Sequence, residues 1–143
     1  MKHLLNRLIN HESISSEEAK QALVNISNGM YNQSQIASFL TVYMMRSISV
    51  EELDGFREAL LDLCLPIDLS DFETIDLCGT GGDGKDTFNI STLSSFVTAG
   101  AGVKVAKHGN YGVSSNCGSA DVLEALKINI NLKPNEVEEN IKP

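Results

Sequence analysis

The stretch that decides the fold is LCGTGGDGKDTFNIST, residues 77–92, which places four glycines within six positions. Three of them match the dinucleotide pattern G-x-G-x-x-G, and residues 79–85 match a P-loop without its final Ser or Thr. A P-loop needs a hydroxyl after Lys85 to bind magnesium, but Asp86 stands there. A dinucleotide site needs an acidic residue about 20 positions further on, where this chain has lysines. Both specific interpretations fail, but a glycine loop that approaches an anion remains.

The residues around this loop alternate between strand and helix patterns. Short strands are predicted at 74–77 and 103–106, with a third at 128–132. Helices are predicted from the Asn89 cap to Gly100, over 121–126 and from Pro134 onward. Strand, loop, helix and strand in this order are typical of a parallel sheet covered by helices.

Two features favour a phosphorylated small molecule as the ligand of the loop. Glycine lets the backbone approach an anion closely, and the helix that begins after Asn89 offers unpaired N–H groups. Residues 79–120 carry three lysines against two aspartates, whereas the whole chain has a net charge of −8. The glycine region is therefore locally non-acidic on an acidic protein. The alternative is a set of tight turns that need glycine for their backbone conformation only.

The first 70 residues predict a helical domain instead. A short helix fits 2–10, and capping boxes at Ser15 with Glu18 and at Ser49 with Glu52 begin two more. A further helix is capped by Asn32 or Ser34. Apolar residues recur at helical spacing in these segments and are interpreted as core or interface. The predicted fold class is therefore α/β, with an all-helical domain (1–70) followed by the start of a parallel-sheet α/β domain (71–143).

Composition excludes several other classes of protein. A net charge of −8 argues against a nucleic-acid surface, which needs a basic field. No apolar run approaches the roughly 18 residues of a membrane span, and the N-terminal residues are too polar for a secretory signal. Cys64, Cys78 and Cys117 are odd in number and widely spaced, so we expect reduced, buried or half-buried thiols and a cytoplasmic protein.

Five short motifs in register then resemble one enzyme family. They are GTGGD (79–83), NIST (89–92), KHGN (107–110), VSS (113–115) and GSADVLEAL (118–126). Together they resemble anthranilate phosphoribosyltransferase, most closely over residues 74–127. The resemblance implies a homodimer with a nucleoside phosphorylase-like fold that works in tryptophan biosynthesis. It implies that the phosphoribosyl group of phosphoribosyl pyrophosphate (PRPP) passes to anthranilate with release of pyrophosphate, and that Mg²⁺ is required.

The same resemblance implies roles for individual residues. PRPP contacts are expected from Gly79, Gly82, Asp83, Thr87, Asn89, Ile90, Ser91 and Thr92, with Ser91 also a magnesium ligand. Phosphate-side contacts are expected from Lys107, Ser115 and Ser119, and an anthranilate contact from Asn110 with Gly79. His108, Gly109 and Ser114 lie in the same motifs and complete the candidate set. No side chain is expected to act as a nucleophile, because the aromatic amine attacks directly. His108 either accepts a proton or orients the loop, and orientation is favoured.

The sequence also departs from the family. Tyr111 stands where many relatives have Arg, and Asn116 with Cys117 where a basic residue and Ser are common, so positive charge near the phosphates is reduced. Family members are longer, and their later segment supplies an Asp-Glu pair for magnesium and an Arg for anthranilate. We therefore expect this chain to be the N-terminal part of the enzyme and, taken alone, to be inactive. The alternatives are a pyrimidine nucleoside phosphorylase, a non-catalytic nucleic-acid-binding relative and a dimerisation module.

Overall fold

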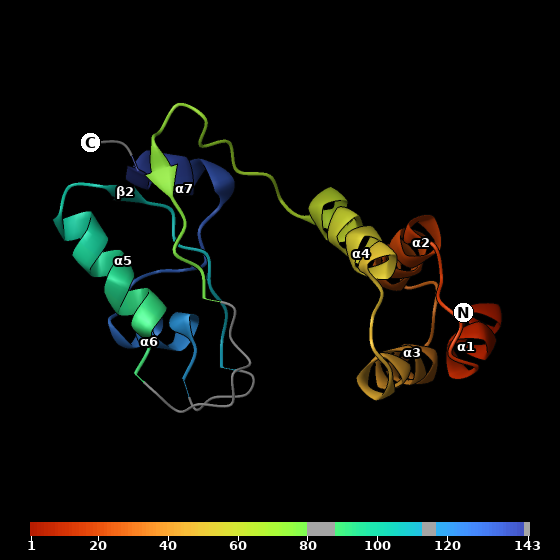
Figure 1. Cartoon of the computed structure of the whole chain (residues 1–143). Coiled ribbons are helices and arrows are strands. Elements are labelled where there is room, and N and C mark those ends of the chain that lie inside the picture. The colour runs from red at the N-terminus through yellow and green to blue at the C-terminus, as the bar shows by residue number, and fades with distance from the viewer. Residues whose placement is uncertain (80–87, 113–116, 142–143) are drawn as a thin grey trace. The chain divides into compact units, whose positions relative to one another are not determined.

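The computed structural model describes residues 1–79, 88–112 and 117–141 and divides into two compact units, Met1–Leu65 and Pro66–Pro143. Figure 1 shows the helices of the first unit and the mixed helices and strands of the second. We describe each unit by itself, since the fold of each follows from its own sequence pattern.

The first unit is a helical bundle whose helix starts are fixed by side-chain caps. Ser15, Asn32 and Ser49 each accept a hydrogen bond from the backbone three residues on, and the side chain of that residue accepts the N–H of the cap in return. Asn32, not Ser34, is thus the cap of the third helix. The helices are α1 (Lys2–Ile9), α2 (Ser16–Ser27), α3 (Gln33–Met45) and α4 (Val50–Leu63).

The core of this unit is small and only partly matches the predicted apolar stripes. Leu8, Ile14 and Phe39 are almost fully buried, and Phe39 packs edge-on against Tyr43 and Phe56. Other members of the same stripes are more than half exposed; these are Leu40, Leu53 and Leu60. The stripes therefore supply both a core and an exposed apolar surface.

The second unit begins as a parallel α/β fold. Strands β1 (Thr74–Ile75) and β2 (Lys104–Val105) pair in parallel, and the Ala106 N–H extends the ladder by donating to the Ile75 carbonyl. Between them runs α5 (Ile90–Gly100), which packs on β2. Two further helices follow, α6 (Ser119–Ala125) and α7 (Pro134–Ile141). The predicted fold class, a helical domain followed by an α/β domain with parallel strands, is confirmed.

One prediction about this unit was wrong, and a second was correct except for its bounds. The expected strand at 128–132 is coil, because the Ile128 N–H donates to Leu123 O at the end of α6 and the Asn131 N–H bonds locally to the Asn129 side chain. These local bonds use donors that a strand ladder would need. The helix predicted over 121–126 starts two residues earlier, at Ser119, with Gly118 in the cap position.

The prediction of buried cysteines was also wrong. Cys64, Cys78 and Cys117 are all exposed, since each lies at the end of a helix or in a loop and not on an inward face. Within the described ranges, no helix combines the length and apolar character that a membrane span requires.

Candidate functional site

The candidate site lies where the two parallel strands end. Residues 76–79 follow β1, residues 106–110 follow β2, and the first residues of α5 and α6 come to the same place. Ligands of open parallel sheets bind at the carboxyl ends of the strands, where loops and helix N-termini converge.

The Lys107 ammonium group is the centre of this cluster. Its Nζ donates to the carbonyl oxygens of Leu77 at 3.1 Å and His108 at 2.9 Å, and lies 3.4 Å from Ser91 Oγ. Ser91 Oγ is in turn 3.4 Å from Ser119 Oγ. One cation and two hydroxyls thus gather from the end of β2 and the starts of α5 and α6. This combination of donors suits a phosphate oxygen.

The start of α5 is shaped by Asn89. Its Oδ1 accepts the Thr92 N–H at 3.0 Å and the Ser91 hydroxyl at 3.2 Å, so Asn89 is the N-cap that the sequence predicts. The cap orients Ser91 toward Lys107. Thr92 is only 2% exposed, and its Oγ1 meets no hydrogen-bond partner in the described part of the chain. Ile90, by contrast, is exposed.

Glycines allow the segments of the site to approach each other closely. A Cβ on Gly109 would lie 2.7 Å from Ser119 Cβ, and a Cβ on Gly118 would lie 2.4 Å from the Asn110 carbonyl oxygen. A Cβ on Gly79 would meet Ser91 at 3.5 Å, which is an ordinary contact. The backbone that carries Lys107 is therefore in direct contact with the start of α6, where the Ala120 N–H also donates to Asn110 O.

Sequence reasoning missed two carboxylates that accept hydrogen bonds from backbone N–H groups near Lys107 and at the start of α6. Asp76 Oδ1 accepts the His108 N–H at 3.1 Å and links the segments after β1 and β2. Asp121 Oδ2 accepts the N–H groups of Gly112 at 2.9 Å and Gly118 at 2.7 Å. These two bonds lower the pKa of Asp121 below its usual value, since they favour the charged form. The spacing of Gly118 and Asp121, that of a helix cap and its third residue, was the available signal.

The structure therefore brings together part of the predicted set. Gly79, Asn89, Ser91, Lys107 and Ser119 lie in one cluster, with His108, Gly109 and Asn110 in the segment that carries Lys107. Gly82, Asp83, Thr87, Ser114 and Ser115 lie outside the described residues. Asn116, one of the expected departures from the family, also lies outside them, whereas Tyr111 donates its hydroxyl proton to Glu124 at 2.7 Å.

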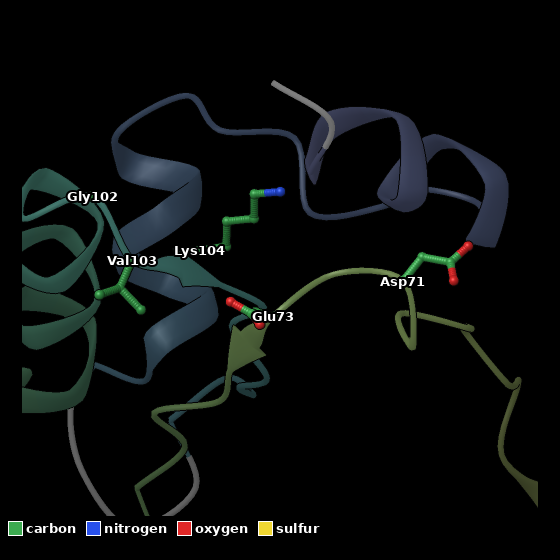
Figure 2. A pocket seen from close by; sticks show the side chains of 5 residues that line it. All are labelled: Asp71, Glu73, Gly102, Val103 and Lys104. Atoms are coloured by element: carbon green, nitrogen blue, oxygen red, sulfur yellow. The ribbon is translucent and has the colours of Figure 1, made fainter.

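A pocket also lies at the opposite end of the strands. It is lined by Asp71, Glu73, Gly102, Val103 and Lys104, from the segments that lead into β1 and β2 (Figure 2). Lys104 Nζ lies 5.3 Å from the centroid of the Phe72 ring. Because this pocket is at the amino ends of the strands, it is not where a parallel sheet binds its ligand.

The sequence matches the glycosyl transferase family, as its helical bundle domain over residues 2–64 and as its a/b domain over residues 71–143. The chain belongs to this glycosyl transferase family.

Relatives with high sequence identity to the chain share one enzymatic activity. The chain is 75% identical over 134 residues to an anthranilate phosphoribosyltransferase of Flavobacterium psychrophilum, covering 94% of this chain and 41% of the relative. It is 67% identical to one of Flavobacterium johnsoniae, covering 99% of this chain and 43% of that protein. The predicted resemblance to anthranilate phosphoribosyltransferase is confirmed. The chain thus spans about two fifths of the length of these relatives.

Solved structures agree with the sequence relatives. The crystal structure of anthranilate phosphoribosyltransferase from Thermus thermophilus matches with a TM-score of 0.80 at 35% identity, covering 96% of this chain and 42% of that chain. The enzyme from Saccharomyces cerevisiae in complex with PRPP and Mg matches with a TM-score of 0.77 at 26% identity, covering 95% of this chain and 42% of that chain.

Proposed function

We propose that this chain supplies the PRPP-binding part of an anthranilate phosphoribosyltransferase, a cytoplasmic enzyme of tryptophan biosynthesis. The observation that carries the proposal is the Lys107, Ser91 and Ser119 cluster at the carboxyl ends of β1 and β2. The yeast relative that was solved with PRPP and Mg supports the choice of ligand.

The cluster suits the charge that develops during phosphoribosyl transfer. Breaking the bond between the anomeric carbon and pyrophosphate leaves negative charge on the departing group and positive charge on the ribose. The Lys107 ammonium group already points one donor at Ser91 Oγ, and a phosphate oxygen would replace that neutral partner with a charged one. Hydrogen bonds that strengthen as charge develops lower the barrier, so Lys107 stabilises the leaving group.

Anthranilate, which accepts the phosphoribosyl group, needs to be oriented more than it needs to be activated. Anthranilate attacks through its own amine, so the protein supplies no covalent nucleophile. The Asn110 side chain accepts the Tyr111 N–H through Oδ1 at 2.8 Å, which leaves its amide NH₂ to meet the carboxylate of anthranilate. His108 is pinned through its backbone, since Asp76 accepts its N–H and Lys107 donates to its carbonyl. We assign His108 to orienting the loop.

The described residues suit a magnesium ion only when the substrate phosphates also coordinate it. Within the described ranges, no group of three or more His, Cys, Asp or Glu side chains could hold a metal ion. Ser91 Oγ, beside the Asn89 amide oxygen, offers neutral oxygen donors. Mg²⁺ keeps waters and binds substrate phosphates, so Ser91 would hold an ion that arrives with PRPP. Such an ion would neutralise charge on the pyrophosphate.

The helical unit is proposed to form a homodimer. Exposed apolar side chains gather on α3 and α4, where Met44 and Met45 are 86% and 79% exposed and Leu53 and Leu60 are 55% and 61% exposed. Burying such side chains against a second copy removes apolar surface from water.

Isothermal titration calorimetry with PRPP and MgCl₂ tests the proposed function. We expect saturable binding of PRPP that weakens when magnesium is omitted, and competition by pyrophosphate, which shares the leaving-group contacts. Binding of single-stranded DNA at low salt with no heat from PRPP would favour the nucleic-acid-binding alternative. Loss of anthranilate fluorescence that depends on PRPP is not expected from residues 1–143 alone, and observing it would contradict the expectation that this part of the enzyme is inactive by itself.

A further inference from the structure

Asp121 makes contacts that the proposed reaction does not use. It lies in α6, beyond the cluster around Lys107, and is partly exposed. One of its carboxylate oxygens, Oδ2, accepts two backbone N–H groups, one from the segment after β2 (Gly112) and one from the start of α6 (Gly118). A single oxygen thereby joins two backbone segments.

The segment after β2 and the start of α6 are in close backbone contact where Asp121 joins them. A Cβ on Gly118 would lie 2.4 Å from three backbone atoms, namely Asn110 O, Gly112 N and Tyr111 C. The Ala120 N–H donates to Asn110 O at 3.1 Å on the same side. Backbone therefore lies directly on backbone here, and the carboxylate holds the contact closed.

This contact determines the position of Ser119. Ser119 stands between Gly118 and Ala120, and its Cβ lies 2.7 Å from the position that a Cβ on Gly109 would take. Its Oγ is 3.4 Å from Ser91 Oγ, the hydroxyl that Lys107 approaches. A shift of the start of α6 away from the Lys107 segment would consequently move the Ser119 hydroxyl away from Ser91 and Lys107.

We propose that Asp121 is a positioning residue of the PRPP site, which fixes Ser119 beside Ser91 by holding the N–H groups of Gly112 and Gly118 on one oxygen. The inference rests on the proposed function, because PRPP is the ligand whose affinity reports on it. The charge of Asp121 strengthens both bonds, since hydrogen bonds to a carboxylate are shorter and stronger than neutral ones.

Three variants test this role. Asp121→Ala removes the acceptor and is expected to weaken PRPP binding about tenfold or more, as loss of a supporting contact does at other sites. Asp121→Asn keeps an oxygen that can accept both N–H groups and is expected to restore the PRPP Kd to within about threefold of the unaltered protein. Asp71→Ala, which removes a carboxylate from the pocket at the opposite end of the strands, is the matched charge control.

Hydrogen exchange supplies a readout that does not depend on PRPP. In Asp121→Ala the amides of Gly112 and Gly118 are expected to exchange faster, while the amides of α5, which belongs to the same unit, keep their protection. This separates a local release from general unfolding. In Asp121→Asn the two glycine amides are expected to stay protected.

The outcomes distinguish the two proposals. If the unaltered protein does not bind PRPP, the proposed function fails whatever the glycine amides show. If the unaltered protein binds PRPP and Asp121→Ala binds it equally well, positioning by Asp121 is overturned. It is also overturned if Asp121→Asn binds PRPP as weakly as Asp121→Ala while the Gly112 and Gly118 amides of Asp121→Asn remain protected. Faster exchange together with weaker PRPP binding, both reversed in Asp121→Asn, supports it.

Discussion

At Gly109 the absence of a side chain has a structural consequence. Lys107 and Ser119 come from different elements, and their segments meet at Gly109, where a Cβ would lie 2.7 Å from Ser119 Cβ. That atom is attached directly to the backbone of α6, so it cannot rotate away as the end of a long side chain would. The glycine is therefore required by close approach and not by a turn.

Gly109→Ala is expected to weaken PRPP binding about tenfold, because the added methyl group displaces Ser119 from Ser91. Gly100→Ala is the matched control, since a Cβ at the end of α5 would meet nothing within 4 Å. Titration of both variants with PRPP and magnesium measures the difference. Equal affinity for the two would contradict a close contact between Gly109 and the start of α6.

Glu52 carries a different kind of constraint in the helical unit. It is 0% exposed, and its carboxylate accepts N–H groups from Ile14 at 3.0 Å and Ser49 at 2.9 Å and forms an ion pair with Arg46. The side chain of Arg46 is itself only 8% exposed. Removing the charge of Glu52 would leave a guanidinium group buried without its partner, which is costly.

We expect Glu52→Gln to lower the free energy of unfolding by about 3 kcal/mol. Glu18→Gln is the matched control, because Glu18 occupies the same third position of a capping box but its side chain is 35% exposed. It is expected to cost less than about 1 kcal/mol. Urea unfolding followed by far-UV circular dichroism measures both. A similar loss in the two variants would show that burial of the Glu52 pair adds nothing.

The ion pair of Glu52 with Arg46 also predicts how the stability of the folded protein depends on pH. Burial by itself raises the pKa of Glu52, but the hydrogen bonds from Ser49, Arg46 and Ile14 outweigh it and hold the pKa below its ordinary value of 4.5. A lowered pKa in the folded state gives stability that is present above pH 4.5 and is lost as the pH falls through the folded value. The unfolding midpoint is expected to fall with pH below 4.5, and less steeply in Glu52→Gln. Parallel pH profiles for the two proteins would contradict this.

At the scale of whole elements, the sequence predicts helices better than strands. The caps at Ser15, Ser49 and Asn89 are local patterns that involve residues three apart, so they can be identified without the fold. The strand predicted at 128–132 failed because its apolar residues satisfy a strand pattern while its N–H groups bond to nearby residues. Pairing between strands depends on distant partners, which a single window of sequence does not contain.

The same distinction applies to the site. The glycine loop, the Asn89 helix start and Lys107 follow a strand-loop-helix pattern, which is visible in sequence. The roles of Asp76 and Asp121 depend on which backbone N–H groups lie near their carboxylates after folding. The resemblance to a family placed Ser119 among the candidates, but only the structure shows that its hydroxyl lies beside Ser91.

At the scale of the whole molecule, the exposed apolar side chains of α3 and α4 predict self-association. The double variant Leu53→Glu and Leu60→Glu is expected to sediment as a monomer, because charges in an apolar interface lose hydration without a partner. Met30→Glu, at a 68% exposed side chain between α2 and α3, is the control and should remain dimeric. Unaltered protein that sediments as a monomer at high concentration would contradict the proposed dimer.

The central claim is that the carboxyl ends of β1 and β2 bind PRPP, and two lysines three residues apart test it directly. Lys107 lies at those ends and contacts Ser91 Oγ, whereas Lys104 lines the pocket at the amino ends. Replacing either by Ala removes the same charge, so any general electrostatic effect is common to both. The measurement is the Kd for PRPP with magnesium at matched ionic strength. The account predicts a loss of about tenfold or more for Lys107→Ala and less than about twofold for Lys104→Ala. Equal losses, or a larger loss for Lys104→Ala, would contradict it.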